Sequence, residues 1–301
     1  MELVFGAVME QPILPPNPSH PLFWTVKGFV FVFSIIGNGF VVYLMVTRTQ
    51  LLKVISNWFI LSLAIADLLV TVVVFVPEVY FLCFRDNIFP WNFKLCYDML
   101  TRTSCYNLCA LTFERYVAVV EPLKYGRLTC KTRLIFLIIA SVWILGIVSP
   151  LPYYICFRLH HFVAFRAVML VFLFTGEFLP TVVLVMVYAK MILVVRRQEK
   201  MVERQNKQVQ YNYGSVFVQK NRYDRRNRSN IQVLGVILSV FVLCYSVSCY
   251  KGFINYVLFK DVSYWTIYVT RILYQLNSAV NGFVYALLKK DFKQEVKKNR
   301  I

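Results

Sequence analysis

Residues 57–83 read NWFILSLAIADLLVTVVVFVPEVYFLC, an apolar stretch longer than the roughly 20 residues with which a helix crosses a bilayer. Two carboxylates interrupt it, Asp67 and Glu78. A charge is costly in hydrocarbon, so each of these side chains must face other helices or water. The stretch therefore predicts a membrane helix that is one member of a bundle.

Six further apolar blocks of comparable length occur in the 301 residues. The overall composition agrees, because 58% of the residues are hydrophobic and 16% are charged, against about 45–50% and about 25% in soluble domains. We expect an all-α protein with seven transmembrane helices within residues 22–288, an N-terminus of residues 1–21, and a cytoplasmic short helix and tail over residues 289–301. The blocks are residues 22–47, 57–83, 96–120, 133–155, 168–195, 231–258 and 263–288.

The basic residues lie almost entirely on one side of this bundle. Alternate connections and the tail carry 22 Lys and Arg, ten of them in residues 196–228, whereas the opposite connections carry five. The positive-inside rule makes the basic side cytoplasmic and the N-terminus extracellular in a multi-pass plasma-membrane protein. The net charge of +18 then fits attraction to anionic lipid and predicts no nucleic-acid partner.

Signatures of enzymes are scarce. The sequence has no Gly-x-x-x-x-Gly-Lys loop, no His-Glu-x-x-His and no Gly-x-Ser-x-Gly. We expect no enzyme activity and no organic cofactor.

Asp67 lies in the middle of its block among residues that offer its carboxylate nothing, so it needs partners from other helices. Together with water, such partners could hold a small cation such as sodium. The alternative is a protonated carboxyl in a plain hydrogen-bond network. The available partners are Asn38, Ser104, Asn277, Ser278 and Asn281.

The chain resembles the rhodopsin-like (class A) G-protein-coupled receptors over nearly its whole length. The resemblance rests on ordered motifs, each on the expected helix. They are Gly37-Asn38, Leu63-Ala64-x-Ala66-Asp67, Trp91, Glu114-Arg115-Tyr116, Pro122-Leu123, Trp143, Pro180 with Tyr188, Phe241-x-x-Cys244, Asn277-Ser278-x-x-Asn281-x-x-x-Tyr285, and Phe292 in a basic segment that looks like the family's eighth helix.

The resemblance implies roles in coupling to a heterotrimeric G protein. Glu114 would hold Arg115 in the inactive receptor and release it when the sixth helix swings outward. Leu123 resembles the apolar residue that enters a pocket of the G protein. The same set includes Tyr116, Tyr188, Asn281 and Tyr285, of which Tyr188 and Tyr285 resemble tyrosines that turn toward the arginine on activation.

The chain also departs from the family pattern. Tyr245 and Val247 stand where the sixth helix usually has Trp and Pro, and Gly282 replaces the proline that follows Asn281. Asn227 stands where many relatives place a second acidic partner, which leaves Glu114 alone to restrain the arginine. These changes favour a further hypothesis for the function, namely a pseudo-receptor that folds but signals poorly.

The third helix looks short, since Cys96 precedes Arg115 by only 19 residues, about six fewer than usual in the family. Either this receptor shortens the helix or the sequence lacks residues there. Cys83, Cys96 and Cys156 can lie near the oxidising outer face. We expect a Cys96–Cys156 disulfide, because it would join the third helix to the connection after the fourth.

The ligand, a small molecule or a peptide, should occupy an outward-opening cavity lined by intramembrane polar residues. A simple amine is disfavoured, since Tyr97 or Thr103 stands where amine receptors carry an aspartate. The alternative is that acids and bases pair with each other, as Glu177 and Arg102 could. The candidate ligand residues are Glu78, Tyr97, Asp98, Arg102, Glu177, Tyr245, Lys251 and Arg271.

The rival from another functional class is a transporter or channel that uses the same buried polar residues. Such proteins show broken helices and an internal repeat of hydropathy between their halves. Neither is visible in the sequence, so a receptor without covalent chemistry is favoured.

Overall fold

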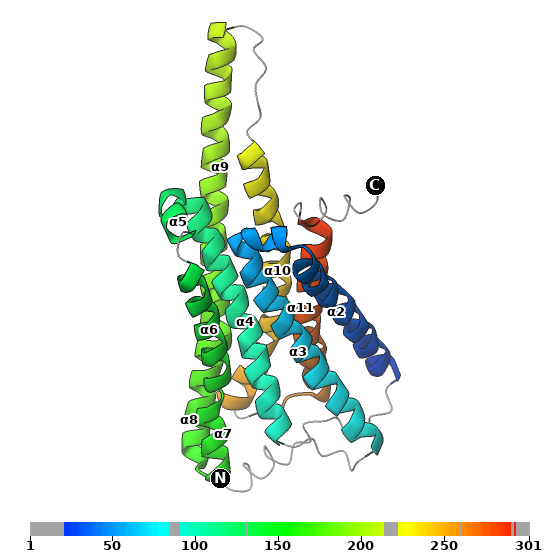
Figure 1. Ribbon diagram of the computed structural model, residues 1–301. Helices are drawn as coiled ribbons and strands as arrows, with labels where there is room; N and C mark the ends of the chain where they lie inside the picture. Colours follow the sequence, from blue (N-terminus) through cyan, green and yellow to red (C-terminus); the bar gives the residue numbers. More distant parts are fainter. Residues whose placement is uncertain are drawn as a thin grey trace.

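The computed structural model describes residues 21–84, 91–129, 132–213, 222–258, 260–289 and 292. Within these ranges the chain is helical and forms seven rods that pack side by side (Figure 1). The rods are α2 (Pro21–Thr47), α3 (Ile55–Phe84), α4 (Trp91–Val120), α6 (Thr132–Val148) with α7 (Leu151–Arg158), α8 (Phe162–Leu173) with α9 (Leu179–Tyr213), α10 (Arg222–Tyr256) and α11 (Tyr264–Leu288).

Two short elements complete the described chain, a 3-10 turn η1 (Thr49–Lys53) and the helix α5 (Pro122–Thr129). A π-helical turn, η2 (Phe174–Phe178), joins α8 to α9. We call the end of the bundle that carries α5 the α5 end, and the other the α7 end. Helix α9 runs far beyond the bundle at the α5 end (Figure 1).

Five segments of the described chain are long and apolar enough to cross a membrane. Four of them lie in α2, α3, α10 and the α6–α7 rod, and the fifth runs from Val163 to Gln205 through α8 and α9. The rods α4 and α11 are more polar, since they carry much of the buried hydrogen-bonding chemistry. On α4 the buried polar residues are Thr101, Arg102, Thr103, Ser104, Asn107, Thr112 and Glu114.

The bundle is apolar outside and partly polar inside. Large hydrophobic side chains such as Phe29, Phe33 and Leu145 are more than half exposed, as lipid-facing residues are. Inside, Trp143 of α6 donates to Ser62 Oγ of α3 at 2.9 Å, and Ser62 donates to Asn107 Oδ1 of α4 at 2.7 Å. These bonds fix the three helices against each other, because a polar group without a partner is costly in an apolar interior.

The structure corrects two helix boundaries. Helix α4 begins at Trp91, so Cys96 lies inside it rather than at its start. The connection expected over residues 196–228 is largely helical, because α9 continues to Tyr213 and α10 begins at Arg222. The extension of α9 is rich in Lys, Glu, Gln and Arg, which favour helix, and Glu203 pairs with Lys207 four residues later at 2.9 Å.

The expected extracellular N-terminus lies outside the described residues, apart from Pro21 at the start of α2. The same holds for the expected eighth helix, of which only Lys289 and Phe292 are described. The Phe292 side chain is fully buried and belongs to the main apolar core.

Gly282 has a packing role. A Cβ at this position would lie 2.5 Å from the Gly37 carbonyl carbon and would overlap the Asn38 backbone nitrogen. Helices α2 and α11 therefore approach closely at a point where only glycine fits. Asn38 uses this proximity to donate to the Ser278 carbonyl oxygen at 3.0 Å.

Candidate functional site

At the α5 end, Arg115 lies at the last turns of α4 and is held by its neighbour Glu114. The guanidinium donates through Nε to Glu114 Oε2 at 2.6 Å and through Nη2 to Oε1 at 2.8 Å. Both side chains are mostly buried. A two-point charge-assisted bond of this kind is stronger and more directional than an exposed pair.

Glu114 is held from two further sides that the sequence did not indicate. Ser56 of α3 donates to Oε1 at 2.9 Å, and Tyr125 of α5 donates to the same oxygen at 2.6 Å. Burial and the neighbouring Glu114 carboxylate raise the pKa of Tyr125 to about 12, so its hydroxyl remains a donor at neutral pH. Glu114 thus links α3, α4 and α5.

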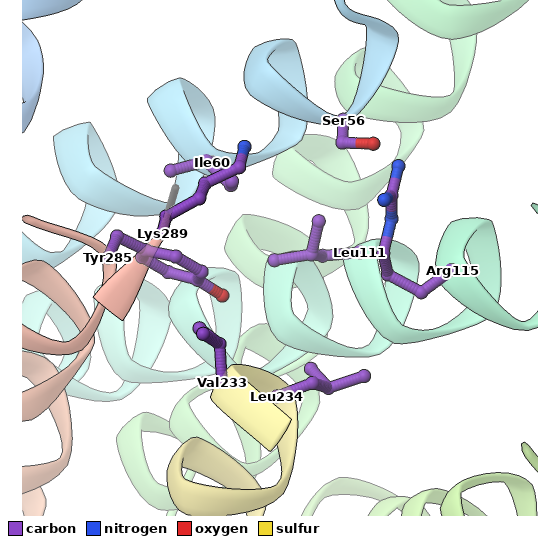
Figure 2. Close-up of a pocket in the computed structure, with 8 residues that line it drawn as sticks. All are labelled: Ser56, Ile60, Leu111, Arg115, Val233, Leu234, Tyr285 and Lys289. Atoms are coloured by element: carbon purple, nitrogen blue, oxygen red, sulfur yellow. The ribbon is translucent and has the colours of Figure 1, made fainter. Parts of the chain in front are cut away.

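Beside Arg115 a small pocket of about 20 Å³ opens between α3, α4, α10 and α11, large enough for a water molecule. Figure 2 shows the Tyr285 ring reaching from α11 toward Leu111. The Tyr285 hydroxyl is buried and makes no hydrogen bond within the described residues. The pocket is lined by Ser56, Ile60, Leu111, Arg115, Val233, Leu234, Tyr285 and Lys289.

Lys289 also lines this pocket, although from the sequence it was expected only to add a positive charge to the tail. It is 4% exposed, donates to Asn57 Oδ1, and lies 5.3 Å from the Phe292 ring centroid. Its position immediately after the last apolar block was the feature of the sequence that could have indicated a buried lysine.

Three more residues expected to couple to a G protein lie at the same end, whereas the fourth, Asn281, bonds to Asp67 in the middle of the bundle. Leu123 on α5 is 86% exposed, far more than an apolar side chain buried in a core. Tyr116 and Tyr188 are partly buried against the main core, and Lys190 Nζ lies 5.3 Å from the Tyr116 ring centroid. The structure therefore brings together Arg115, Tyr285 and the exposed Leu123 at one end of the bundle.

In the middle of the bundle, Asp67 is fully buried and meets two of its expected partners. Ser104 Oγ donates to Oδ1 at 2.6 Å, and Asn281 Nδ2 donates to Oδ2 at 2.9 Å. Asn277 and Asn281 each keep a side-chain oxygen without a partner among the described residues. A carboxylate with neutral oxygens nearby is the ligand chemistry that hard cations prefer, so the residues fit a sodium ion with water.

In the α7-end half, Glu78 of α3 lies between two cations. It forms a buried ion pair with Lys27 of α2, and Arg271 of α11 lies 3.6 Å from its Oε1. Glu78 and Arg271 were among the residues expected to meet a ligand, but Lys27, which is 1% exposed, was not. A lysine within an apolar block was the signal for it.

A second buried ion pair joins α4 to η2. Arg102 Nη2 donates to Glu177 Oε1 at 2.9 Å, and Tyr274 of α11 donates to the same oxygen at 2.9 Å. Gly176 makes room for the arginine, because a Cβ there would overlap the guanidinium. The pairing of Arg102 with Glu177, which the sequence left as an alternative to ligand binding, is formed.

Aromatic side chains lie next to this pair. The Tyr245 ring stacks on Phe241 at 4.1 Å and meets Tyr274 edge to face at 5.3 Å. Tyr274 also meets Tyr97 edge to face at 6.0 Å, and Ser248 hydrogen-bonds to the Tyr274 hydroxyl. Tyr245 therefore fills a core position between Phe241 and Tyr274.

Asp98 and Lys251 complete the candidate ligand residues. Asp98 accepts from Lys94 at 2.5 Å and from the Tyr153 hydroxyl. Lys251 of α10 is half-buried and interacts electrostatically with Glu177, Lys94, Arg271 and Asp98.

The expected disulfide is not formed, since Cys96 and Cys156 are both free. Cys96 is exposed on α4, whereas Cys156 of α7 packs against the apolar cluster of Tyr153, Phe165, Met169 and Phe172. The earlier start of α4 accounts for this, because it places Cys96 within the helix instead of at its top.

Comparisons with known proteins agree with this geometry. A family described as "7 transmembrane receptor (rhodopsin family)" matches residues 37–285. The chain is 27% identical to the Drosophila melanogaster octopamine receptor beta-1R over 317 aligned positions, covering 91% of this chain and 60% of that receptor. It is 33% identical to the Mus musculus D(3) dopamine receptor over 199 positions, or 58% of this chain and 42% of the relative.

The Drosophila melanogaster RYamide receptor is 36% identical over 129 positions, which cover 41% of this chain and 27% of that receptor. The chain thus spans less than two thirds of the length of each of these three relatives. The family match covers most of the chain, with the buried Asp67, the Glu114–Arg115 pair and Tyr285 within it. The chain therefore belongs to the rhodopsin family of seven-transmembrane receptors.

Proposed function

We propose that this receptor couples a ligand bound in the α7-end half to activation of a heterotrimeric G protein at the α5 end. The α5 end is the cytoplasmic face in this proposal, since the extension of α9 there carries Arg196, Arg197, Lys200, Arg204 and Lys207. The N-terminus is then extracellular. The relatives are named for amines and for a peptide, so the ligand is a small molecule or a peptide.

The observation that carries the proposal is the two-point bond between Glu114 and Arg115 beside a pocket at the mouth of the bundle. A G protein needs a site at this end, and an arginine released from its partner supplies one. Ser56 and Tyr125 favour the closed arrangement, because both donate to the carboxylate that holds the arginine. Ligand binding shifts the population toward the released state, for which it must have the higher affinity.

Asp67 supports the same two-state behaviour. We propose that it holds a sodium ion, with Ser104, Asn277 and Asn281 supplying oxygens directly or through water. An ion at this point stabilises the arrangement in which α3, α4 and α11 are drawn together. It thereby opposes activation, since binding to one state shifts the population toward it.

The test is guanine-nucleotide exchange on purified G proteins by the full chain in nanodiscs. We expect Arg115→Ala to abolish receptor-dependent exchange and Glu114→Gln to raise the ligand-free rate several-fold. Loss of about 1.4 kcal/mol of restraint shifts the two-state equilibrium tenfold. Arg158→Ala is the matched control, since Arg158 is an exposed arginine at the α7 end.

Three results would contradict the proposal. Exchange that persists in Arg115→Ala would remove the arginine from the mechanism. An absence of receptor-dependent exchange in both the parent and Glu114→Gln would favour the pseudo-receptor. Solute or ion flux through the chain in liposomes would favour the transporter or channel.

A further inference from the structure

Among the described residues, the α7-end half holds more positive than negative charge. Eight ionisable side chains there form one connected set of electrostatic interactions, and five of them are cations. The set consists of Lys27, Lys94, Arg102, Lys251 and Arg271 with Glu78, Asp98 and Glu177. A charge imbalance inside a membrane bundle is unfavourable unless a counter-charge binds.

Three of the cations have a carboxylate of their own. Lys27 pairs with Glu78, Lys94 with Asp98, and Arg102 with Glu177. The two that remain are Arg271 and Lys251. Arg271 reaches Glu78 only at 3.6 Å, beyond hydrogen-bond distance, and Lys251 makes no ion pair or hydrogen bond within the described part of the chain.

The unpartnered polar atoms of this half also include more donors than acceptors. The Tyr97 hydroxyl and Arg102 Nη1 are buried donors without a partner in the described ranges, whereas Glu177 Oε2 is a buried acceptor without one. The Tyr97 ring lies 6.0 Å from that of Tyr274, whose hydroxyl bonds to Glu177, so Tyr97 is close to the Arg102–Glu177 pair. Gln275, 2% exposed on α11, leaves both ends of its amide without partners there.

We propose that this half of the receptor binds a small organic acid, whose carboxylate is held by Arg271 and Lys251. The guanidinium of Arg271 suits a carboxylate because it can donate two parallel hydrogen bonds, and Lys251 adds a second positive charge from α10. Tyr97 donates to the same anion. The inference rests on the proposed function and names the chemical class of its ligand.

Such a ligand would bridge α10 and α11. The two cations repel each other in the empty receptor, and an anion between them draws the helices together. The acid therefore acts on α10, which also carries Val233 and Leu234 of the pocket beside Arg115.

The test uses three probes with one carbon skeleton and different charge: 3-phenylpropanoate, 3-phenylpropanamide and 3-phenylpropylamine. Thermal unfolding of the full chain in nanodiscs is followed with each probe at up to about 10 mM, since a ligand of this size is expected to bind at millimolar concentration. At ten times its Kd a ligand adds about 1.4 kcal/mol of stability, so we expect the acid to raise the Tm by about 3 °C and the amide and the amine to leave it unchanged.

Variants locate the effect. Arg271→Gln and Lys251→Gln should each abolish the shift caused by the acid, and Arg271→Lys should retain part of it. Lys190→Gln, at the α5 end, is the control and should keep the full shift. Without any probe, Lys251→Gln should raise the Tm slightly, because it removes an uncompensated charge; a purely structural lysine would give the opposite sign.

A larger shift with the amine, equal shifts with all three probes, no shift with the acid, or a shift that survives in Arg271→Gln and Lys251→Gln would each overturn the inference. Arg115-dependent nucleotide exchange is measured without probe in the same preparation. Its absence would contradict the proposed function and leave the Tm comparison intact, so the two failures are distinguishable.

Discussion

The buried pair of Arg102 and Glu177 gives the sharpest prediction for stability. The two side chains are 5% and 8% exposed, and the donor and acceptor atoms are 2.9 Å apart. Glu177→Gln keeps the shape of the side chain but leaves the Arg102 charge buried without its counter-charge. Removing one partner of such a pair costs about 3–5 kcal/mol. At about 2 °C per kcal/mol for a chain of this length, the Tm should fall by about 6–10 °C.

The assay is thermal unfolding of the purified receptor in nanodiscs, followed by tryptophan fluorescence. The matched control is Glu203→Gln, which breaks an ion pair whose side chains are 74% and 65% exposed and should leave the Tm unchanged. The double variant Arg102→Met/Glu177→Leu should recover most of the loss, since a buried ion pair can be replaced by apolar groups at little cost. A Glu177→Gln receptor that is as stable as Glu203→Gln would refute the reasoning.

Two further predictions concern Asp67 and Gly282. Replacing potassium chloride by sodium chloride should raise the Tm of the parent receptor but not that of Asp67→Asn, which lacks the carboxylate charge; equal sodium effects in both would exclude the proposed ion site. Gly282→Ala should lower stability by about 1–3 kcal/mol, because its Cβ would meet backbone atoms of α2. Gly39→Ala is the control, with open space at its Cβ, and a helix there should gain up to about 1 kcal/mol, so equal effects of the two alanines would contradict the close approach.

The sequence was sufficient to predict the seven helices and the polar residues that are costly to bury. It was not sufficient to predict every partner of those polar residues. Asp67 was expected to find partners on other helices because a buried carboxylate needs them, and the structure confirms two of the five candidates, Ser104 and Asn281. The pairing of Glu114 with Arg115 was implied by the resemblance to the receptor family, and the structure shows the bond.

Partners that depend on helix rotation were harder to predict. Lys27 was missed because its role follows from the direction in which one turn of α2 faces, which brings its ammonium onto Glu78. The disulfide between Cys96 and Cys156 was wrong for a related reason, since it assumed that α4 begins at Cys96. The helical extension of α9 was missed because charge was taken to indicate a loop, although the spacing of Glu203 and Lys207 favours helix.

The continuation of α9 and α10 beyond the bundle has a practical consequence for imaging. A helical protein inserted between Tyr213 and Arg222 could continue both helices without a break. It would then be held in a fixed orientation and could serve as a marker for image alignment. Each residue added at the junction would turn the graft by about 100° and advance it by about 1.5 Å. A short series of linker lengths would therefore sample the orientations around the axis and identify the one that leaves the receptor unobstructed.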